Sequence, residues 1–236
     1  MVPSPLPPDR SRRLGSTVSS QLDAGLAEIA GDRSHGAGYL ARKALGILHL
    51  APVERRAEIA ARLSVLRPAM PAIEAAIGEA MDCADVRAVI QRGDAERRRV
   101  ARAAIGPIAG RRVGTISNSS LVARALIYAR PTLVQIVVAG PDDEGHLLAS
   151  DLRTAGLDAE TIAIDQLEAE LAVVGCDAVF EDGSFINRLG TAALVARLPT
   201  LVLVDRWKRL DHPPPGAWPE PERFEIVQDD SVRAPA

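Results

Sequence analysis

Apolar residues recur at intervals of three and four positions over the first half of the chain, as in Leu22, Leu26 and Ile29. This is the period of an amphipathic α-helix, and several such stretches follow one another. Pro68 ends one stretch, because a proline ring interrupts the hydrogen bonds of a helix. We therefore predict a helical subdomain over residues 18–108.

The pattern changes beyond residue 108, where short apolar runs alternate with amphipathic stretches. Such alternation is typical of βαβ units, which build a parallel sheet covered by helices. The expected strands are Arg112–Ile116, Leu133–Ala139, Ala159–Ile164, Ala178–Phe180 and Thr200–Val204. The expected helices between them are Ser120–Ala129, Glu144–Ala155, Gln166–Val173 and Gly190–Arg197. The predicted fold class is α/β, with a helical N-terminal subdomain and, over residues 109–210, a Rossmann-like parallel sheet with helices on both faces.

The two ends of the chain differ from the rest in composition. Residues 1–17 are rich in Pro, Ser and Arg, which indicates a disordered tail. Residues 211–236 are expected to form a Pro-rich C-terminal tail with one candidate edge strand, Phe224–Val227.

Composition and charge narrow the function classes. The 236 residues are 47% hydrophobic but 3% aromatic, enough for an aliphatic core of one large or two modest domains. No run approaches the roughly 20 apolar residues that cross a bilayer, and the first residues lack the apolar segment of a signal peptide. We therefore expect a cytoplasmic protein without a membrane partner. A net charge of −3 gives no attraction to nucleic acid, so the run Glu96–Arg99 is interpreted as a solvated helix face.

The residue types that bind metals are few and scattered. Cys83 and Cys176 are the only cysteines and are expected to be reduced. The four histidines lack the spacing of a metal site. The sequence contains neither the G-x-S-x-G of a serine hydrolase nor, after the first strand, the G-x-G-x-x-G of a dinucleotide site. We expect no metal and no cofactor.

Polar loops follow the predicted strands, and in a parallel sheet these loops gather at one edge, where ligands bind. The first loop, Thr115–Ser120, is either an anion site at a helix N-terminus or a plain set of helix caps. The second, Ala139–Gly145, is acidic, which argues against direct contact with a phosphate. The third loop places Asp177 between two apolar runs. We interpret Asp177 either as a general acid or base or as the cap of a turn.

A fourth loop, Gly183–Thr191, brings Asn187 and Arg188 to the start of a predicted helix, where they would bind a phosphate oxygen. Lys208 follows the last predicted strand and is one of only two lysines. It either reaches the same edge or is a surface charge.

Together these loops resemble the superfamily of translation initiation factor 2B α, β and δ subunits. Its enzyme members are methylthioribose-1-phosphate isomerase and ribose-1,5-bisphosphate isomerase. The longest matching block is GCDAVFEDGSFINRLGT, residues 175–191. Shorter matches are Pro141–Gly145, Asp165, Lys208 and the segment DRSHGAGYLARKAL from Asp32. The resemblance spans residues 32–208 and implies the same helical and Rossmann-like parts as the periodicity.

The resemblance also implies roles for individual residues. Asp177 matches the catalytic acid of the isomerases, and Asn187 with Arg188 matches an Asn-Lys pair that holds the sugar phosphate. Arg can also hold a phosphate, and with two hydrogen bonds. The expected ligand-binding set is Gly36, Ala37, Asn118, Ser119, Asn187, Arg188, Thr191 and Lys208.

Two departures from the isomerases bear on catalysis. Ser117 stands where they have a reactive Cys, and residues 138–141 lack an Arg that would bind phosphate. A serine hydroxyl is a far weaker acid and nucleophile than a thiol, so Ser117 is the weaker member of a catalytic pair with Asp177. Cys176 corresponds to a small residue in the family and is interpreted as a buried apolar side chain.

Three functions are compatible with this sequence. The chain is a regulatory binding protein for a phosphorylated sugar or nucleotide, an aldose–ketose isomerase acting on a ribose phosphate, or a structural subunit of an oligomer. The two lost catalytic groups favour the regulatory or catalytically degenerate protein. Because members of the superfamily pair through this domain, the resemblance also implies a homodimer.

Overall fold

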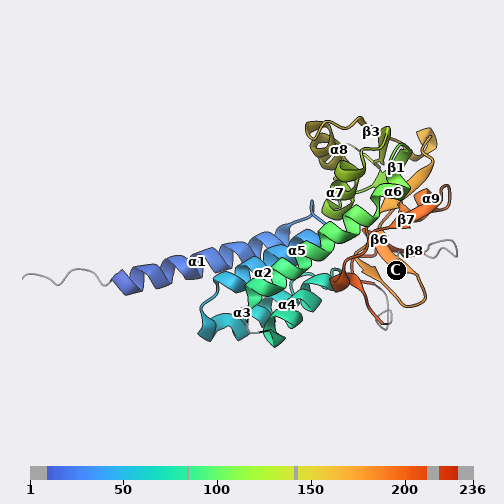
Figure 1. Ribbon diagram of the computed structural model, residues 1–236. Helices are drawn as coiled ribbons and strands as arrows, with labels where there is room; N and C mark the ends of the chain where they lie inside the picture. Colours follow the sequence, from blue (N-terminus) through green and yellow to red (C-terminus); the bar gives the residue numbers. More distant parts are fainter. Residues whose placement is uncertain (1–9, 84, 141–142, 212–217, 228–236) are drawn as a thin grey trace, which may run out of the picture.

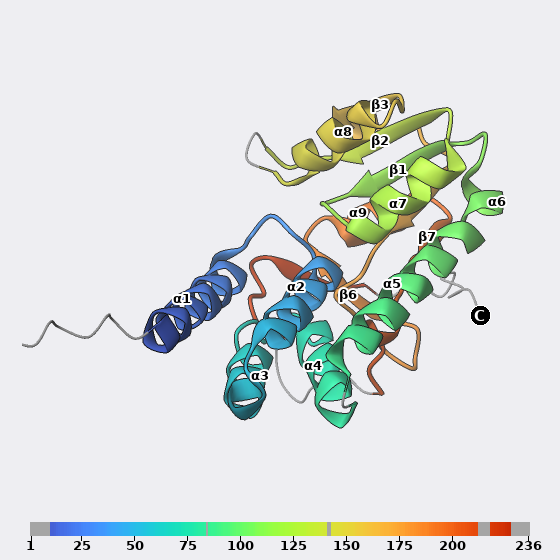
Figure 2. The same ribbon diagram turned by 60° about the vertical axis from the view of Figure 1, so that its left-hand side comes forward.

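The computed structural model describes residues 10–83, 85–140, 143–211 and 218–227. It has a helical part and an α/β part, and one long helix extends from the first into the second (Figures 1 and 2). The helices of the first part are α1 (Arg10–Gly31), α2 (Ala37–Leu50), α3 (Arg56–Ser64), α4 (Ala72–Asp82), α5 (Val86–Ala103) and α6 (Ile105–Ile108), with a 3-10 turn η1 (Val53–Arg55). None of the helices in these described ranges is both long and apolar enough to span a membrane.

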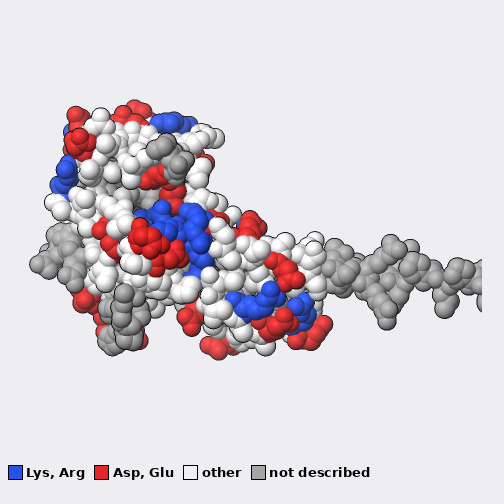
Figure 3. All heavy atoms as spheres, turned by 180° about the vertical axis from the view of Figure 1, so that it is seen from behind, with Lys and Arg blue, Asp and Glu red and all other residues white. Residues whose placement is uncertain are grey.

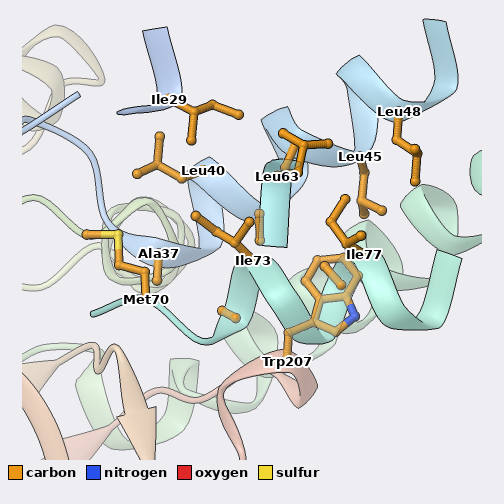
Figure 4. Close-up of a cluster of buried hydrophobic side chains, with 14 of the residues drawn as sticks. Ile29, Ala37, Leu40, Leu45, Leu48, Leu63, Met70, Ile73, Ile77 and Trp207 are labelled. Atoms are coloured by element: carbon orange, nitrogen blue, oxygen red, sulfur yellow. The ribbon is translucent and has the colours of Figure 1, made fainter. Parts of the chain in front are cut away.

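Aliphatic side chains from α1 to α5 form the core of the helical part (Figure 4). They lie at the three- and four-residue spacing read from the sequence, as with Leu22, Leu26 and Ile29. Trp207 enters this core from the 3-10 turn η3 (Arg206–Lys208), which follows the last strand of the parallel sheet. Its ring lies against Gly93 of α5, where an added Cβ would be 2.3 Å from a ring carbon. The two parts are therefore packed together around this residue.

Five parallel strands make up the sheet of the α/β part, in the order β3-β2-β1-β4-β7. They are β1 (Arg112–Ile116), β2 (Leu133–Val137), β3 (Ala159–Ile162), β4 (Leu171–Val174) and β7 (Thr200–Val202). Helices α7 (Ser120–Ala129) and α8 (Gly145–Thr154) cover one face together with α6. Helix α9 (Thr191–Val195) and a second, smaller sheet cover the other. The predicted fold class is confirmed.

One predicted helix is wrong. The segment Gln166–Val173 contains instead the end of a 3-10 turn, η2 (Ile164–Gln166), a connection and most of strand β4. Side chains of β4 alternate between the hydrophobic cores on the two faces of the sheet, which explains the unbroken apolar run. A short apolar run of this kind has no period that separates a buried strand from a helix.

The predicted strand Ala178–Phe180 does not join the parallel sheet. Its residues form β5 (Ala178–Val179) in an antiparallel sheet of order β5-β6-β8, with β6 (Phe185–Arg188) and β8 (Phe224–Val227). Strand β6 was expected to be a loop. The predicted edge strand at 224–227 is present as β8, paired with β6.

Both predicted tails are partly ordered. Helix α1 begins at Arg10, so residues 10–17 are helical where disorder was expected, and residues 1–9 lie outside the described residues. Trp218 and Phe224, in the predicted C-terminal tail, are buried against the helical core.

A buried ion pair joins the two parts of the molecule. Arg97 of α5 is 6% exposed, and its Nη1 lies 3.3 Å from Oδ2 of Asp205, just before η3. Its Nη2 also donates a hydrogen bond of 2.6 Å to Oγ of Ser120, the first residue of α7. The expectation that the whole run Glu96–Arg99 is a solvated face is therefore wrong for Arg97, whose partner lies 108 positions away in the chain.

We predict that Arg97→Ala lowers the free energy of unfolding by about 3 kcal/mol, because it leaves Asp205 buried without its cation. Arg98→Ala, one position along the same helix but exposed, should change it by less than about 0.5 kcal/mol. Urea denaturation followed by circular dichroism measures both. Equal effects of the two substitutions would contradict a structural role for the ion pair.

Candidate functional site

Polar side chains from both parts of the molecule line one narrow cavity at the carboxyl ends of β1 and β4. Its lining residues are His35, Gly36, Met70, Ser117, Asn118, Ser119, Glu144, Gly175, Cys176, Asp177, Asn187, Arg188, Lys208, Arg223 and Phe224. Eight of the ten residues singled out from the sequence are among them. The other two, Ala37 and Thr191, hydrogen bond to Asp177 and Asn187 respectively. The structure thus brings together the residues chosen from separate loops, while their roles stay predictions.

Asp177 lies at the bottom of this cavity, 5% exposed. Its Oδ1 accepts a hydrogen bond of 3.4 Å from the backbone N–H of Ala37, the first residue of α2. Gly36 is the N-cap of this helix, so the Gly-Ala pair covers the carboxylate. Burial raises the pKa of Asp177, and the charge of Lys208 opposes this effect. A raised pKa keeps a carboxyl group protonated to a higher pH than an exposed one, which suits a general acid.

Lys208 is buried beside Asp177, not on the surface. Its Nζ donates a hydrogen bond to the backbone oxygen of Cys176. The thiol of Cys176 is itself buried, which raises its pKa to about 12. It therefore remains protonated near neutral pH and is no substitute for a reactive thiolate.

Asn187 and Arg188 lie in strand β6, not in the loop that the sequence indicated. Nδ2 of Asn187 donates to Oγ1 of Thr191 at 3.2 Å, and this hydroxyl donates to the backbone oxygen of Arg188 at 2.6 Å. The chain turns into α9 at Gly190, whose φ of 95° is a conformation that favours glycine. These contacts fix the direction of both side chains at the cavity.

The first loop both caps a helix and lines the cavity. Ser119 accepts a hydrogen bond of 3.4 Å from the backbone N–H of Val122 and so caps α7. Nδ2 of Asn118 donates to the backbone oxygen of Ser34, at 3.1 Å, and ties the loop to the helical part. Ser117 has a φ of 68°, a conformation that costs a non-glycine residue on the order of 1 kcal/mol or more.

Glu144 was not identified from the sequence, although it contacts two of the predicted residues. Its Oε1 lies 3.1 Å from Nε of Arg188 and also accepts a hydrogen bond from the hydroxyl of Ser117. The acidic second loop was expected to stay away from a phosphate. Here Glu144, just before α8, places a carboxylate against Arg188 instead. An acidic residue at a helix N-terminus is ordinary, so the sequence held no signal for this contact.

A second residue missed from the sequence is Arg67, which is 3% exposed in the loop between α3 and α4. Its Nη1 donates to the backbone oxygen of Asp32, but its Nε and Nη2 have no partner among the described residues. Burial lowers the pKa of Arg67, and the charges of Arg33 and Arg223 lower it further. Three arginines from distant segments therefore lie close together beside the cavity.

The cavity itself has a volume of only about 20 Å³, which is room for a water molecule or two. It adjoins an open hollow of about 510 Å³, whose lining includes Arg33, Arg188 and Arg223. Asp143, Glu144 and His146 line the same hollow. Figure 3 shows basic side chains gathered at the junction of the two parts, with acidic side chains beside them.

Known proteins of one family are similar to this chain in sequence and fold. The model of the initiation factor 2 subunit family matches residues 70–199, more than half of the chain. The chain belongs to this family. Among curated proteins, ribose 1,5-bisphosphate isomerase of Archaeoglobus fulgidus is 34% identical over 79 residues, which cover 29% of this chain and 25% of that enzyme. The chain thus matches a quarter of that relative's length.

Two solved structures of the family share the fold along almost the whole chain. The translation initiation factor eIF-2B of Pyrococcus horikoshii superposes with a TM-score of 0.75 and 21% identity, covering 90% of this chain and 93% of that one. A chain of the tetrameric eIF2B-beta2-delta2 complex of C. thermophilum superposes with a TM-score of 0.65 and 17% identity, covering 96% and 93%. At these identities the likeness establishes the fold alone.

We predict that the difference in the free energy of unfolding between the original protein and Asp177→Asn changes with pH. As the pH rises from 4 to 7, the original protein should lose stability compared with the variant. The folded-state pKa of Asp177 lies above the ordinary value of 3.8. The unfolded chain therefore ionises first as the pH rises, which favours unfolding until the folded-state pKa is passed. Asparagine cannot ionise and lacks this dependence. Urea denaturation of both proteins at several pH values measures it.

Asp182→Asn is the matched control for this experiment. Asp182 is exposed, and hydrogen bonds from Ser184 lower its pKa below 3.8, so its contribution to stability is lost only below that pH. Stability relative to Asp182→Asn should therefore stay level between pH 4 and 7. A level profile for Asp177→Asn as well would show that burial does not perturb this carboxyl.

Proposed function

We propose that this chain binds a phosphorylated sugar or nucleotide beside Asp177, as a regulatory or catalytically degenerate member of its family. The observation that supports this most directly is the position of Asp177. It is a buried carboxyl that shares one cavity with three cations, Lys208, Arg188 and Arg223, and with the amide of Asn187.

The charges around the site suit an anionic ligand. Arg33, Arg188 and Arg223 line the open hollow that leads to the cavity, and the buried Arg67 lies next to them. Guanidinium groups bind phosphate through paired, charge-assisted hydrogen bonds. A phosphate entering the hollow would therefore meet several donors at once.

The groups available for proton transfer favour a binding role. The isomerases that the sequence resembles pair their acid with a cysteine, and Ser117 stands at that position. Its hydroxyl is already bonded to Glu144, and the nearby thiol of Cys176 remains protonated. Asp177 is then without the thiol partner of those isomerases, although His35, Glu144 and Lys208 line the same cavity.

An aldose–ketose isomerase is the second candidate. Its support is the raised pKa of Asp177, which suits a general acid or base, together with the curated relative named as ribose 1,5-bisphosphate isomerase. Such an enzyme moves a proton between neighbouring carbons of a phosphorylated sugar. A single carboxyl could do this only slowly if its partner group is lost.

A thermal-shift screen tests the binding proposal with ribose 1,5-bisphosphate, methylthioribose 1-phosphate, AMP and GDP. A ligand present at 100 times its dissociation constant should stabilise the protein by about 2.7 kcal/mol. Arg188→Met should weaken binding about ten- to hundredfold, because one charge-assisted contact is lost. The exposed Arg102→Met is the matched control and should bind normally.

The same ligands separate the two candidate functions. If a stabilising sugar phosphate is converted to its ketose and Asp177→Asn abolishes the conversion, the isomerase is correct and the degenerate protein is not. If none of the four compounds stabilises the protein, both candidates lose their support.

We also propose that the chain forms a homodimer. Strand β7 is at the edge of the parallel sheet among the described residues, beside a groove of about 440 Å³ lined by Val100, Ala103, Leu201 and Leu203. An uncovered strand edge with apolar neighbours favours association. Light scattering should give twice the chain mass of 25.1 kDa, and a monomer at micromolar concentration would contradict the proposal.

A further inference from the structure

The ion pair between Glu144 and Arg188 separates the inner cavity from the open hollow. Both residues line the cavity that contains Asp177 and Lys208. Both also line the hollow, as does Arg223. The pair therefore lies where the two spaces adjoin.

Glu144 contacts Arg188 in the way that a ligand anion would. Its Oε1 lies 3.1 Å from Nε of the guanidinium, and the carboxylate side chain is 11% exposed. The hydroxyl of Ser117 donates to the same oxygen. These are two donors, one charged and one neutral, directed at a single carboxylate oxygen.

Arg188 has donor capacity that Glu144 does not use. Its Nη1 is buried and has no hydrogen-bond partner among the described residues. The guanidinium carbon lies 5.8 Å from the centre of the Phe224 ring, which supports the group from one side. A guanidinium held in place with an unused buried nitrogen is better matched to an anion with more oxygens than to one carboxylate oxygen.

The space beside Asp177 is too small for a phosphate while the pair is closed. The cavity has room for a water or two, whereas the adjoining hollow has about 510 Å³. An anionic ligand in the hollow can bind Nε of Arg188 only if the Glu144 carboxylate moves aside, because its Oε1 already occupies that donor. It then competes with an anion of the protein itself.

We propose that Glu144 is an internal anion that holds Arg188 in the absence of ligand and is displaced when a phosphorylated ligand binds. The residue thereby lowers the affinity of the site for anions and determines which of them bind at a given concentration. This inference rests on the proposed function, because it requires that the site binds a phosphorylated ligand.

Glu144→Gln tests the inference, because it keeps the size of the side chain and removes its charge. Inorganic phosphate and ribose 5-phosphate serve as probes in titration calorimetry at pH 7. The variant should bind both about tenfold more tightly than the original protein, because the competing charge-assisted contact is weakened. Glu58→Gln is the matched control: it also removes a carboxylate paired with an arginine, Arg55, on the surface of α3, and should leave binding unchanged.

The double variant Glu144→Gln/Arg188→Met shows whether the tighter binding of Glu144→Gln depends on Arg188. If it does, the double variant should not bind the probes more tightly than the original protein. Circular dichroism and thermal unfolding without ligand establish that each variant is folded. If Glu144→Gln is not folded, Glu144→Ala is used in its place.

Each outcome bears on a different claim. Equal affinity of the original protein and the folded Glu144 variant would overturn the inference and leave the proposed function intact. Weaker binding by the variant would also overturn it, since Glu144 would then assist the ligand. If neither protein binds either probe, the proposed function fails, and the inference fails with it.

Discussion

The buried ion pair between Arg97 and Asp205 is the contact on which the geometry of the site depends. It holds α5 against the turn that carries Lys208, while Ser120 connects the same guanidinium to the start of α7. Helix α2 passes so close that a Cβ at Gly38 would be 2.1 Å from Nη1 of Arg97. This helix presents the Gly36–Ala37 pair to Asp177. The ion pair therefore sets the distance between the helical cover and the sheet edge.

Three oppositely charged pairs are gathered around this junction, and each is shielded from water to some degree. Arg97 with Asp205 is structural, the charge of Lys208 acts on Asp177 within the cavity, and Arg188 with Glu144 lies where the cavity adjoins the hollow. A buried charge is costly unless it has a partner, so all three must be compensated in the protein without ligand.

Membership of the initiation factor 2 subunit family establishes the fold of this chain but not its activity. The backbone follows an initiation factor subunit over nine-tenths of the chain at only 21% identity. Activity depends on a few side chains within that fold. At this site Asp177 is buried, and Glu144 contacts both the hydroxyl of Ser117 and the guanidinium of Arg188. The roles of these side chains are proposals, whereas the architecture is shared with the family.

The sequence by itself determined the helical part, strands β1, β2, β3 and β7 and the meeting of several loops, because periodicity is local and parallel strands end at a common edge. The position of residues 171–174 as a central strand, and of Asn187 and Arg188 in a second sheet, became apparent only in the folded chain. It alone also revealed the contacts of Arg67, Arg97 and Glu144. Their partners lie far away along the chain, and a charged residue on a helix or loop has the same local pattern whether it faces water or a buried counter-charge. The sequence shows which groups are available, and the folded chain decides which of them meet.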